Sequence, residues 1–181
     1  IFLEVVFAAD FTPEAEEELN KKKRIKLFKQ GTTKLEMAND DINFKIVDGG
    51  FVFQDADKVE DDEVANSELK STREASAQEK KDMEIAYKVA SLTKSNCVVY
   101  VKDSAMVAVG MGMTSRVDAA KAALRKAEDL GIDVTGAALA SEAFFPFRDS
   151  IDAAQEAGVK CVIEPGGSIR DDEIIEAANE F

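Results

Sequence analysis

Short apolar runs alternate with amphipathic stretches in the second half of the chain, and this alternation most constrains the fold. Residues 83–92 place their apolar side chains on one helical stripe. The patterns that follow predict strands at 97–101 and 106–109 in a hairpin, then a helix at 115–130, a strand at 136–140, a helix at 149–157, a strand at 160–163 and a helix from 171. Such alternation favours an α/β fold with a largely parallel sheet that is covered on both faces.

The first part of the chain predicts a smaller β-α-β unit followed by a hairpin. In order, the patterns indicate a strand at 3–8, a helix from Pro13 to about residue 23 with Thr12 as its cap, a strand at 25–28, and strands at 42–47 and 51–53. Between the halves, residues 55–82 are acidic and almost lack large apolar side chains. They predict a solvated connector, partly helical toward its end, between subdomains at 1–54 and 83–181.

Composition excludes several classes of chemistry. The chain has 23 Lys and Arg residues against 36 Asp and Glu, a formal charge of −13, and no His. Ser-His-Asp, Cys-His and His-zinc sites therefore cannot be built from these residues alone. The acid excess argues against a nucleic-acid-binding face, because such faces cluster Lys and Arg. A single Arg can still hold a small anionic substrate.

The two cysteines and the apolar runs bear on the cell compartment. Cys97 and Cys161 each lie inside an apolar run, which is typical of small core residues in a reducing, cytoplasmic environment. No apolar run is long enough to predict a membrane span. The chain begins at Ile1 inside a strand-like run without Met, which is typical of a piece of a longer polypeptide.

Four loops are candidates for a ligand site, because ligands of α/β sheets gather where strands lead into helices. Residues 110–116 contain two glycines and Arg116, and they are as consistent with a plain turn as with a phosphate-binding loop. Residues 165–173 offer backbone amides and the Ser168 hydroxyl after a glycine turn, while Asp171 or Asp172 caps the next helix. Asn96 is either a ligand contact or a turn former.

The fourth loop, residues 141–149, carries three phenylalanines, a proline and a charged pair. Aromatic side chains in a connection have two interpretations. Either they pack in the core, which composition alone favours, or they wall a pocket for a planar ring with Arg148 and Asp149 as orienting groups. The acidic cluster at 61–63 is more typical of a solvated loop than of a divalent-ion site, because it lacks a turn glycine and alternating ligands.

At these same segments the sequence resembles the transformylase domain of the bifunctional purine-synthesis enzyme that joins AICAR transformylase to IMP cyclohydrolase. The resembling motifs run almost end to end: Asp10-Phe11-Thr12-Pro13-Glu14-Ala15, Lys94-Ser95-Asn96, Thr114-Ser115-Arg116-Val117-Asp118, Ala143-Phe144-Phe145-Pro146-Phe147-Arg148-Asp149 and Pro165-Gly166-Gly167-Ser168-Ile169-Arg170-Asp171. The resemblance implies cytidine deaminase-like, three-layer α/β/α subdomains with a mixed sheet. It also implies a homodimer with intersubunit sites, and formyl transfer from 10-formyltetrahydrofolate to AICAR.

Site residues follow from the resemblance by matching motifs. Asn96, Arg116 and Phe144 are expected to contact AICAR. Val117, Asp149, Ser168 and Ile169 are expected to line the folate side. The acid excess lies mainly in the connector and on helix faces, so Arg116 is predicted to be free to meet an anionic nucleotide.

The chain departs from the family pattern in ways that bear on activity. The family's catalytic Lys-His pair is expected upstream of this sequence, and a substrate-binding stretch that ends in Arg and His residues is expected downstream. No catalytic residue is therefore assigned here, and the isolated chain is predicted to be inactive. Met111, Met113 and Glu142 differ from the residues that the family commonly has there. Zinc deaminase chemistry is excluded, because there is no His and no Cys pair with three-residue spacing. A non-catalytic binding or dimerisation module is the alternative, and a structural monovalent cation is left open.

Overall fold

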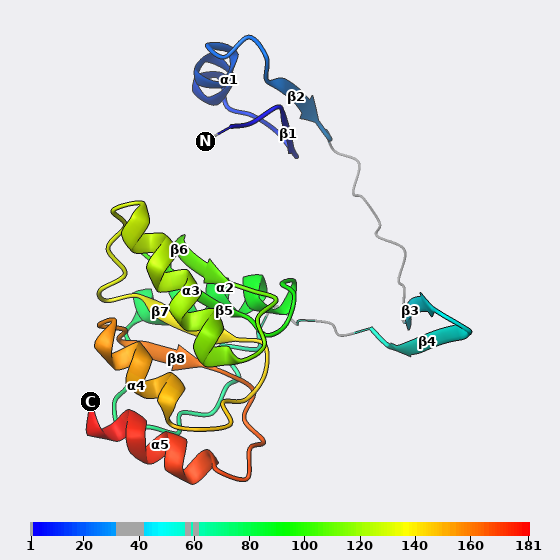
Figure 1. The fold of residues 1–181 in the computed structure, drawn as a ribbon. Coiled ribbons are helices and arrows are strands. Elements are labelled where there is room, and N and C mark those ends of the chain that lie inside the picture. Colours follow the sequence, from blue (N-terminus) through cyan, green and yellow to red (C-terminus); the bar gives the residue numbers. More distant parts are fainter. Residues whose placement is uncertain (1, 32–41, 57–58, 60–61) are drawn as a thin grey trace. The chain divides into compact units, whose positions relative to one another are not determined.

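The computed structural model describes residues 2–31, 42–56, 59 and 62–181 (Figure 1). The chain divides into two compact units, Ile1–Ala56 and Asp57–Phe181, which are described separately.

The first unit begins with the predicted β-α-β arrangement. Strands β1 (Val5–Ala8) and β2 (Lys26–Lys29) pair in parallel, joined by helix α1 (Pro13–Asn20). The Thr12 hydroxyl accepts a hydrogen bond from the Ala15 amide at 3.2 Å, which confirms the predicted cap. The helix ends before the basic run that the sequence placed in its last turn.

The predicted hairpin of the first unit is also present. Strands β3 (Ile42–Val47) and β4 (Gly50–Asp55) pair antiparallel, and the rings of Phe44 and Phe51 stack with centroids 5.0 Å apart. Phe44, Ile46, Phe51 and Phe53 share one face of this ribbon and are all exposed. The apolar alternation therefore predicted the strands correctly without burying them within the described residues.

The second unit is built on one four-stranded sheet in the order β6-β5-β7-β8. Its strands are β5 (Val98–Lys102), β6 (Ala105–Gly110), β7 (Ala138–Ser141) and β8 (Cys161–Ile163). Only β7 and β8 pair in parallel, whereas β5 is antiparallel to both of its neighbours. The prediction of a largely parallel sheet was therefore wrong, because a hairpin inserts β5 in reverse between strands that share one direction.

Helices cover both faces of this sheet, so the second unit is a three-layer α/β/α structure with a mixed sheet (Figure 1). Helix α2 (Ala77–Ser91) packs on one face against Cys97, Val99 and Val101. The opposite face, with Val98 and Tyr100, packs against α3 (Arg116–Asp129) and α4 (Asp149–Glu156), and α5 (Asp171–Glu180) packs beside α4. Successive side chains of β5 thus pack against helices on opposite faces of the sheet, as strand geometry requires.

The described part of the predicted acidic connector is mostly exposed and becomes helical toward its end, but a few of its residues make specific contacts. Helix α2 begins at Ala77, where the Ser76 side chain and the Glu79 side chain form a reciprocal capping box. Val64 is buried against Met83, and the Arg73 guanidinium donates to both the Glu79 carboxylate and the Lys160 carbonyl. This segment belongs to the second unit, where a few of its apolar and basic residues contact partners that composition does not reveal. The cluster at 61–63 lies partly outside the described residues.

The tight turn between β5 and β6 is stabilised by a buried carboxylate from α2. Asp103 and Ser104 both have positive φ, 53° and 64°, so two non-glycine residues adopt a left-handed conformation. The Asp82 carboxylate accepts hydrogen bonds from their amides at 3.1 and 2.7 Å. Side-chain capping therefore holds the predicted hairpin in a conformation that glycine usually supplies.

Gly110 ends β6 where α3 crosses the sheet. A Cβ atom at this position would lie 1.8 Å from the Ala119 carbonyl oxygen. Ala119, Ala120 and Ala123 are all buried on the same helix. Small side chains on both elements thus let the α3 backbone approach β6 closely and set where the N-terminus of α3 lies.

Candidate functional site

Strand direction brings the four candidate loops to one edge of the sheet. Strands β6, β7 and β8 point the same way, so their carboxyl ends lead into α3, α4 and α5 at this edge. The start of β5 lies there too, since Val98 pairs with both Gly110 and Ser141. This edge carries all seven of the sequence-predicted site residues, Asn96, Arg116, Val117, Phe144, Asp149, Ser168 and Ile169. We refer to it as the loop edge.

The Asn96 loop and the 110–116 loop bind each other through their backbones. The Gly112 amide donates to the Lys94 carbonyl at 2.9 Å, and the Met113 amide donates to the Asn96 carbonyl at 3.4 Å. The Asn96 side-chain amide donates to the Met113 carbonyl at 3.0 Å. Two loop amides that a phosphate would need are therefore occupied, and this geometry favours the turn interpretation of the 110–116 loop.

Arg116 lies at the start of α3, where the Ser115 hydroxyl caps the helix as predicted. Its Nε donates to the Ser141 hydroxyl at 3.1 Å and its Nη2 donates to Glu142 Oε1 at 3.0 Å. Only 15% of the Arg116 side chain and 12% of the Glu142 side chain are exposed. The prediction that Arg116 is free was wrong, because the neighbouring strand end supplies a carboxylate within the same loop edge.

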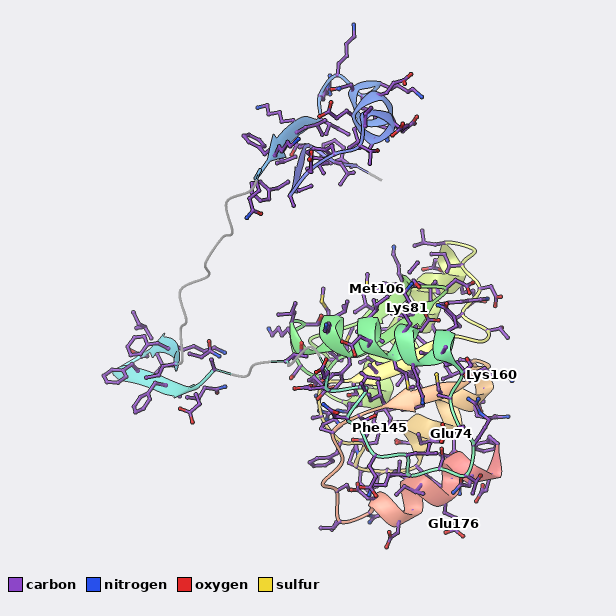
Figure 2. The ribbon with its side chains drawn as sticks, turned by 180° about the vertical axis from the view of Figure 1, so that it is seen from behind. Glu74, Lys81, Met106, Phe145, Lys160 and Glu176 are labelled. Carbon is purple, nitrogen blue, oxygen red and sulfur yellow. The ribbon has the colours of Figure 1, made fainter. Side chains whose placement is uncertain are left out.

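The three phenylalanines of the 141–149 loop divide between the two interpretations. Phe145 is 1% exposed and belongs to the core that α3 and α4 cover (Figure 2). Phe144 and Phe147 are 40% and 50% exposed, and the Arg170 guanidinium lies 4.8 Å from the centre of the Phe147 ring. One ring therefore anchors the loop while the other two face outward, and Phe147 contacts the neighbouring turn.

The glycine turn after β8 already binds two carboxylates of its own chain. The amides of Gly167 and Ser168 donate to Asp171 at 2.8 and 3.0 Å, and the Gly166 amide donates to Glu164 at 2.7 Å. The amides predicted for a ligand are thus occupied. The Ser168 hydroxyl accepts a hydrogen bond from the Arg170 amide at 3.1 Å, whereas Ile169 is fully exposed.

The remaining predicted residues differ in exposure. Asp149 begins α4 with an exposed carboxylate that accepts a hydrogen bond of 3.5 Å from the Ser150 hydroxyl, and Val117 is half-buried in the first turn of α3.

Cys97 and Cys161 are free thiols, and burial raises their pKa values to about 11 and about 12. No group of three or more Cys, Asp or Glu side chains suited to a metal ion occurs within the described ranges.

Glu164 is a half-buried acid at the loop edge that sequence reasoning did not single out. Burial, reinforced by the Asp171 carboxylate, raises its pKa, while the Gly166 amide and Arg116 oppose that shift. Because the folded state then holds the proton more tightly than the unfolded state, the free energy of unfolding falls as pH rises from about 4.5 through the raised pKa.

Replacing Glu164 by Gln removes this titration and keeps an oxygen for the Gly166 amide. We expect the variant to match the parent protein near pH 4 and to be more stable at pH 7, as measured by urea unfolding at both pH values. A variant that is less stable than the parent at pH 7 would show that the Glu164 charge stabilises the turn. Glu173→Gln, in the first turn of helix α5 that follows the same glycine turn, serves as the control.

Comparison with protein families bears on part of the loop edge. A family model described as the AICARFT/IMPCHase bienzyme matches residues 1–126, well over half of the chain. The chain belongs to this family. The match includes Asn96, Arg116 and Val117, and the bienzyme family acts in purine biosynthesis. Phe144, Asp149, Ser168 and Ile169 lie beyond the matched residues on the same sheet edge. Over the described ranges, no helix has the length and apolar character needed to cross a bilayer.

Proposed function

We propose that this chain forms part of the site at which a formyl group passes from 10-formyltetrahydrofolate to AICAR, within a longer bifunctional enzyme. In this reaction the bond between the folate N10 and the formyl carbon breaks. A new amide bond forms to the 5-amino nitrogen of AICAR, and the proton that this nitrogen loses ends on N10. The products are FAICAR and tetrahydrofolate. In this proposal the second unit is a cytidine deaminase-like subdomain, and the protein is cytoplasmic.

The convergence of the candidate loops on one sheet edge is the observation that carries the proposal. Residues expected to contact AICAR come from the start of β5, the start of α3 and the end of β7. Residues expected to contact folate come from the starts of α3 and α4 and from the turn after β8. Two ligands that react with each other must lie side by side, and strand order supplies neighbouring loops for both.

Exposure at the loop edge also supports a site for flat ligands. The large apolar side chain of Phe144 is 40% exposed, and that of Ile169 is fully exposed. Apolar side chains with a few convergent polar groups are typical of small-molecule sites. The imidazole carboxamide of AICAR would cover Phe144, and the Asp149 carboxylate would accept hydrogen bonds from the amino-bearing pterin ring.

The chemistry needs groups that this chain does not contain. The 5-amino group of AICAR is a weak nucleophile because its lone pair is delocalised, so a base and an electrostatic stabiliser must act together. The 181 residues include no His. The Lys-His pair implied by the family resemblance and a second subunit would complete the site, so we propose a homodimer whose sites lie between subunits.

Asp149→Asn in the complete polypeptide tests the folate side. Loss of the carboxylate charge should raise the KM for 10-formyltetrahydrofolate by about 10- to 100-fold, the loss typical of one hydrogen bond to a charged group. The KM for AICAR should stay within about twofold, since the expected AICAR contacts come from other elements. Steady-state kinetics with each substrate varied in turn measures both effects.

Asp172→Asn is the matched control, because Asp172 is an exposed acid in the first turn of the neighbouring helix α5. An unchanged folate KM in the Asp149 variant would remove Asp149 from the site. A complete polypeptide that binds both ligands but transfers no formyl group would instead support the non-catalytic module.

A further inference from the structure

The Glu142 carboxylate joins two of the residues expected to contact AICAR. Glu142 Oε1 accepts a hydrogen bond from Arg116 Nη2 at 3.0 Å, and Oε2 accepts one from the backbone amide of Cys97 at 3.1 Å. Cys97 directly follows Asn96. One carboxylate at the end of β7 therefore fixes the start of α3 and the residue after Asn96 at the same time.

Ser141 reinforces this junction. Its hydroxyl, which is fully buried, receives the Arg116 Nε hydrogen bond at 3.1 Å and lies 3.1 Å from the Cys97 carbonyl oxygen, to which it donates. Arg116 is thus held through two different nitrogens by consecutive residues of one strand end. Such a two-point contact sets the direction of a guanidinium as well as its position.

The charge around Arg116 is not suited to an anion. Glu142 pairs with the guanidinium where both side chains are largely buried, and Glu164 and Asp171 add carboxylates at the next loop, with Glu164 within electrostatic reach of Arg116. One cation therefore faces at least two nearby acids. A phosphate brought to this place would meet a negative local field once the Arg116 charge is neutralised.

We propose that Glu142 is a positioning residue for the AICAR site, and that Arg116 recognises the uncharged part of AICAR and not its phosphate. This inference rests on the proposed function and deepens it. Glu142 directs the remaining N–H groups of Arg116 toward the base or ribose and cancels the charge that would attract the phosphate. The phosphate is then held elsewhere in the complete site.

Calorimetric titration of the complete polypeptide with AICAR and with its nucleoside, which lacks the phosphate, tests the inference. Arg116→Gln should weaken both ligands by the same factor, about 10- to 100-fold for a lost hydrogen bond to a charged group. Glu142→Gln leaves the guanidinium without its counter-charge. It should weaken the nucleoside about tenfold and the nucleotide less, so the ratio of their affinities changes.

Two further variants make the comparison specific. Glu142→Asp keeps the charge and should keep the affinity ratio of the parent protein. Glu176→Gln makes the same chemical change on the exposed face of α5 and should leave both affinities unchanged (Figure 2). If Arg116→Gln weakens AICAR alone and leaves the nucleoside unaffected, Arg116 reads the phosphate and the inference is overturned.

Amide hydrogen exchange separates this inference from the proposed function. If the parent protein binds neither ligand, the proposed AICAR site is wrong, together with the role assigned to Arg116 in it. The exchange rate of the Cys97 amide still tests the positioning role of Glu142. The Cys97 amide should exchange at least tenfold faster in Glu142→Ala than in Glu176→Ala, relative to the β5 amides, since it loses its side-chain acceptor. Equal exchange in the two variants would overturn the positioning role.

Discussion

Replacing Gly110 by Ala is expected to lower the free energy of unfolding of the second unit by about 4 kcal/mol or more, at the upper end of single-residue effects. The added Cβ would lie 1.8 Å from the Ala119 carbonyl oxygen and 2.6 Å from its carbonyl carbon. These are backbone atoms of α3, so no side-chain rotation relieves the overlap. Helix α3 must move away from β6, which opens the packing of its buried alanines.

Two other glycines provide graded controls for urea unfolding followed by circular dichroism. Gly131→Ala places its Cβ in open space but at a φ of +66°, so it should cost only about 1 kcal/mol of backbone strain. Gly50→Ala lies in the first unit, meets no atom within 4 Å and has no positive φ, so it should leave the unfolding of the second unit unchanged. A Gly110 variant no less stable than the Gly131 variant would contradict the close approach of α3 to β6.

Phe145→Ala should destabilise the second unit by about 3–5 kcal/mol, the range for truncating a buried phenylalanine. Its ring is 1% exposed and packs in the cluster between the sheet, α3 and α4. Phe144→Ala changes the same residue type one position earlier. Because the Phe144 ring is 40% exposed, we expect a loss of less than about 1 kcal/mol in stability, with weaker AICAR binding as the main effect.

Thermal unfolding and AICAR titration of the two variants in the complete polypeptide distinguish these roles. Phe145→Leu is the conservative partner, since it keeps most of the buried apolar volume and should recover much of the stability. Equal destabilisation by the Phe144 and Phe145 variants would mean that both rings are core residues. A Phe144 variant with unchanged AICAR affinity would remove that ring from the proposed site.

Local sequence signals predicted the elements of the second unit well. The Ser115 cap, the hairpin around Asp103 and the helices beginning at Asp149 and Asp171 are all present. Each signal depends on residues within one or two turns of chain, so a linear pattern contains the information. The same approach did not find the few contacts that residues 62–76 make with α2 and β8, because these involve partners that composition does not identify.

The candidate site was predictable as a set of loops and not as a set of interactions. The loops at Asn96, Arg116, Asp149 and Ser168 meet at one sheet edge, as the strand-to-helix pattern indicated. The pairing of Arg116 with Glu142 and the occupation of the glycine-turn amides by Asp171 were not predictable. An amide and a carboxylate are potential ligand contacts in a sequence, and only their neighbours in space decide whether they bind each other.

The α/β class, the family resemblance and the order of strands and helices follow from the sequence, because periodicity, caps and turn residues act over short stretches of chain. The reversed insertion of β5, the different burial of Phe144 and Phe145, and the pairing of Arg116 with Glu142 became visible in the folded protein. These depend on which strand ends become neighbours. Strand order is set by packing of the whole sheet, so no local pattern specifies the partners that a charged side chain finds there.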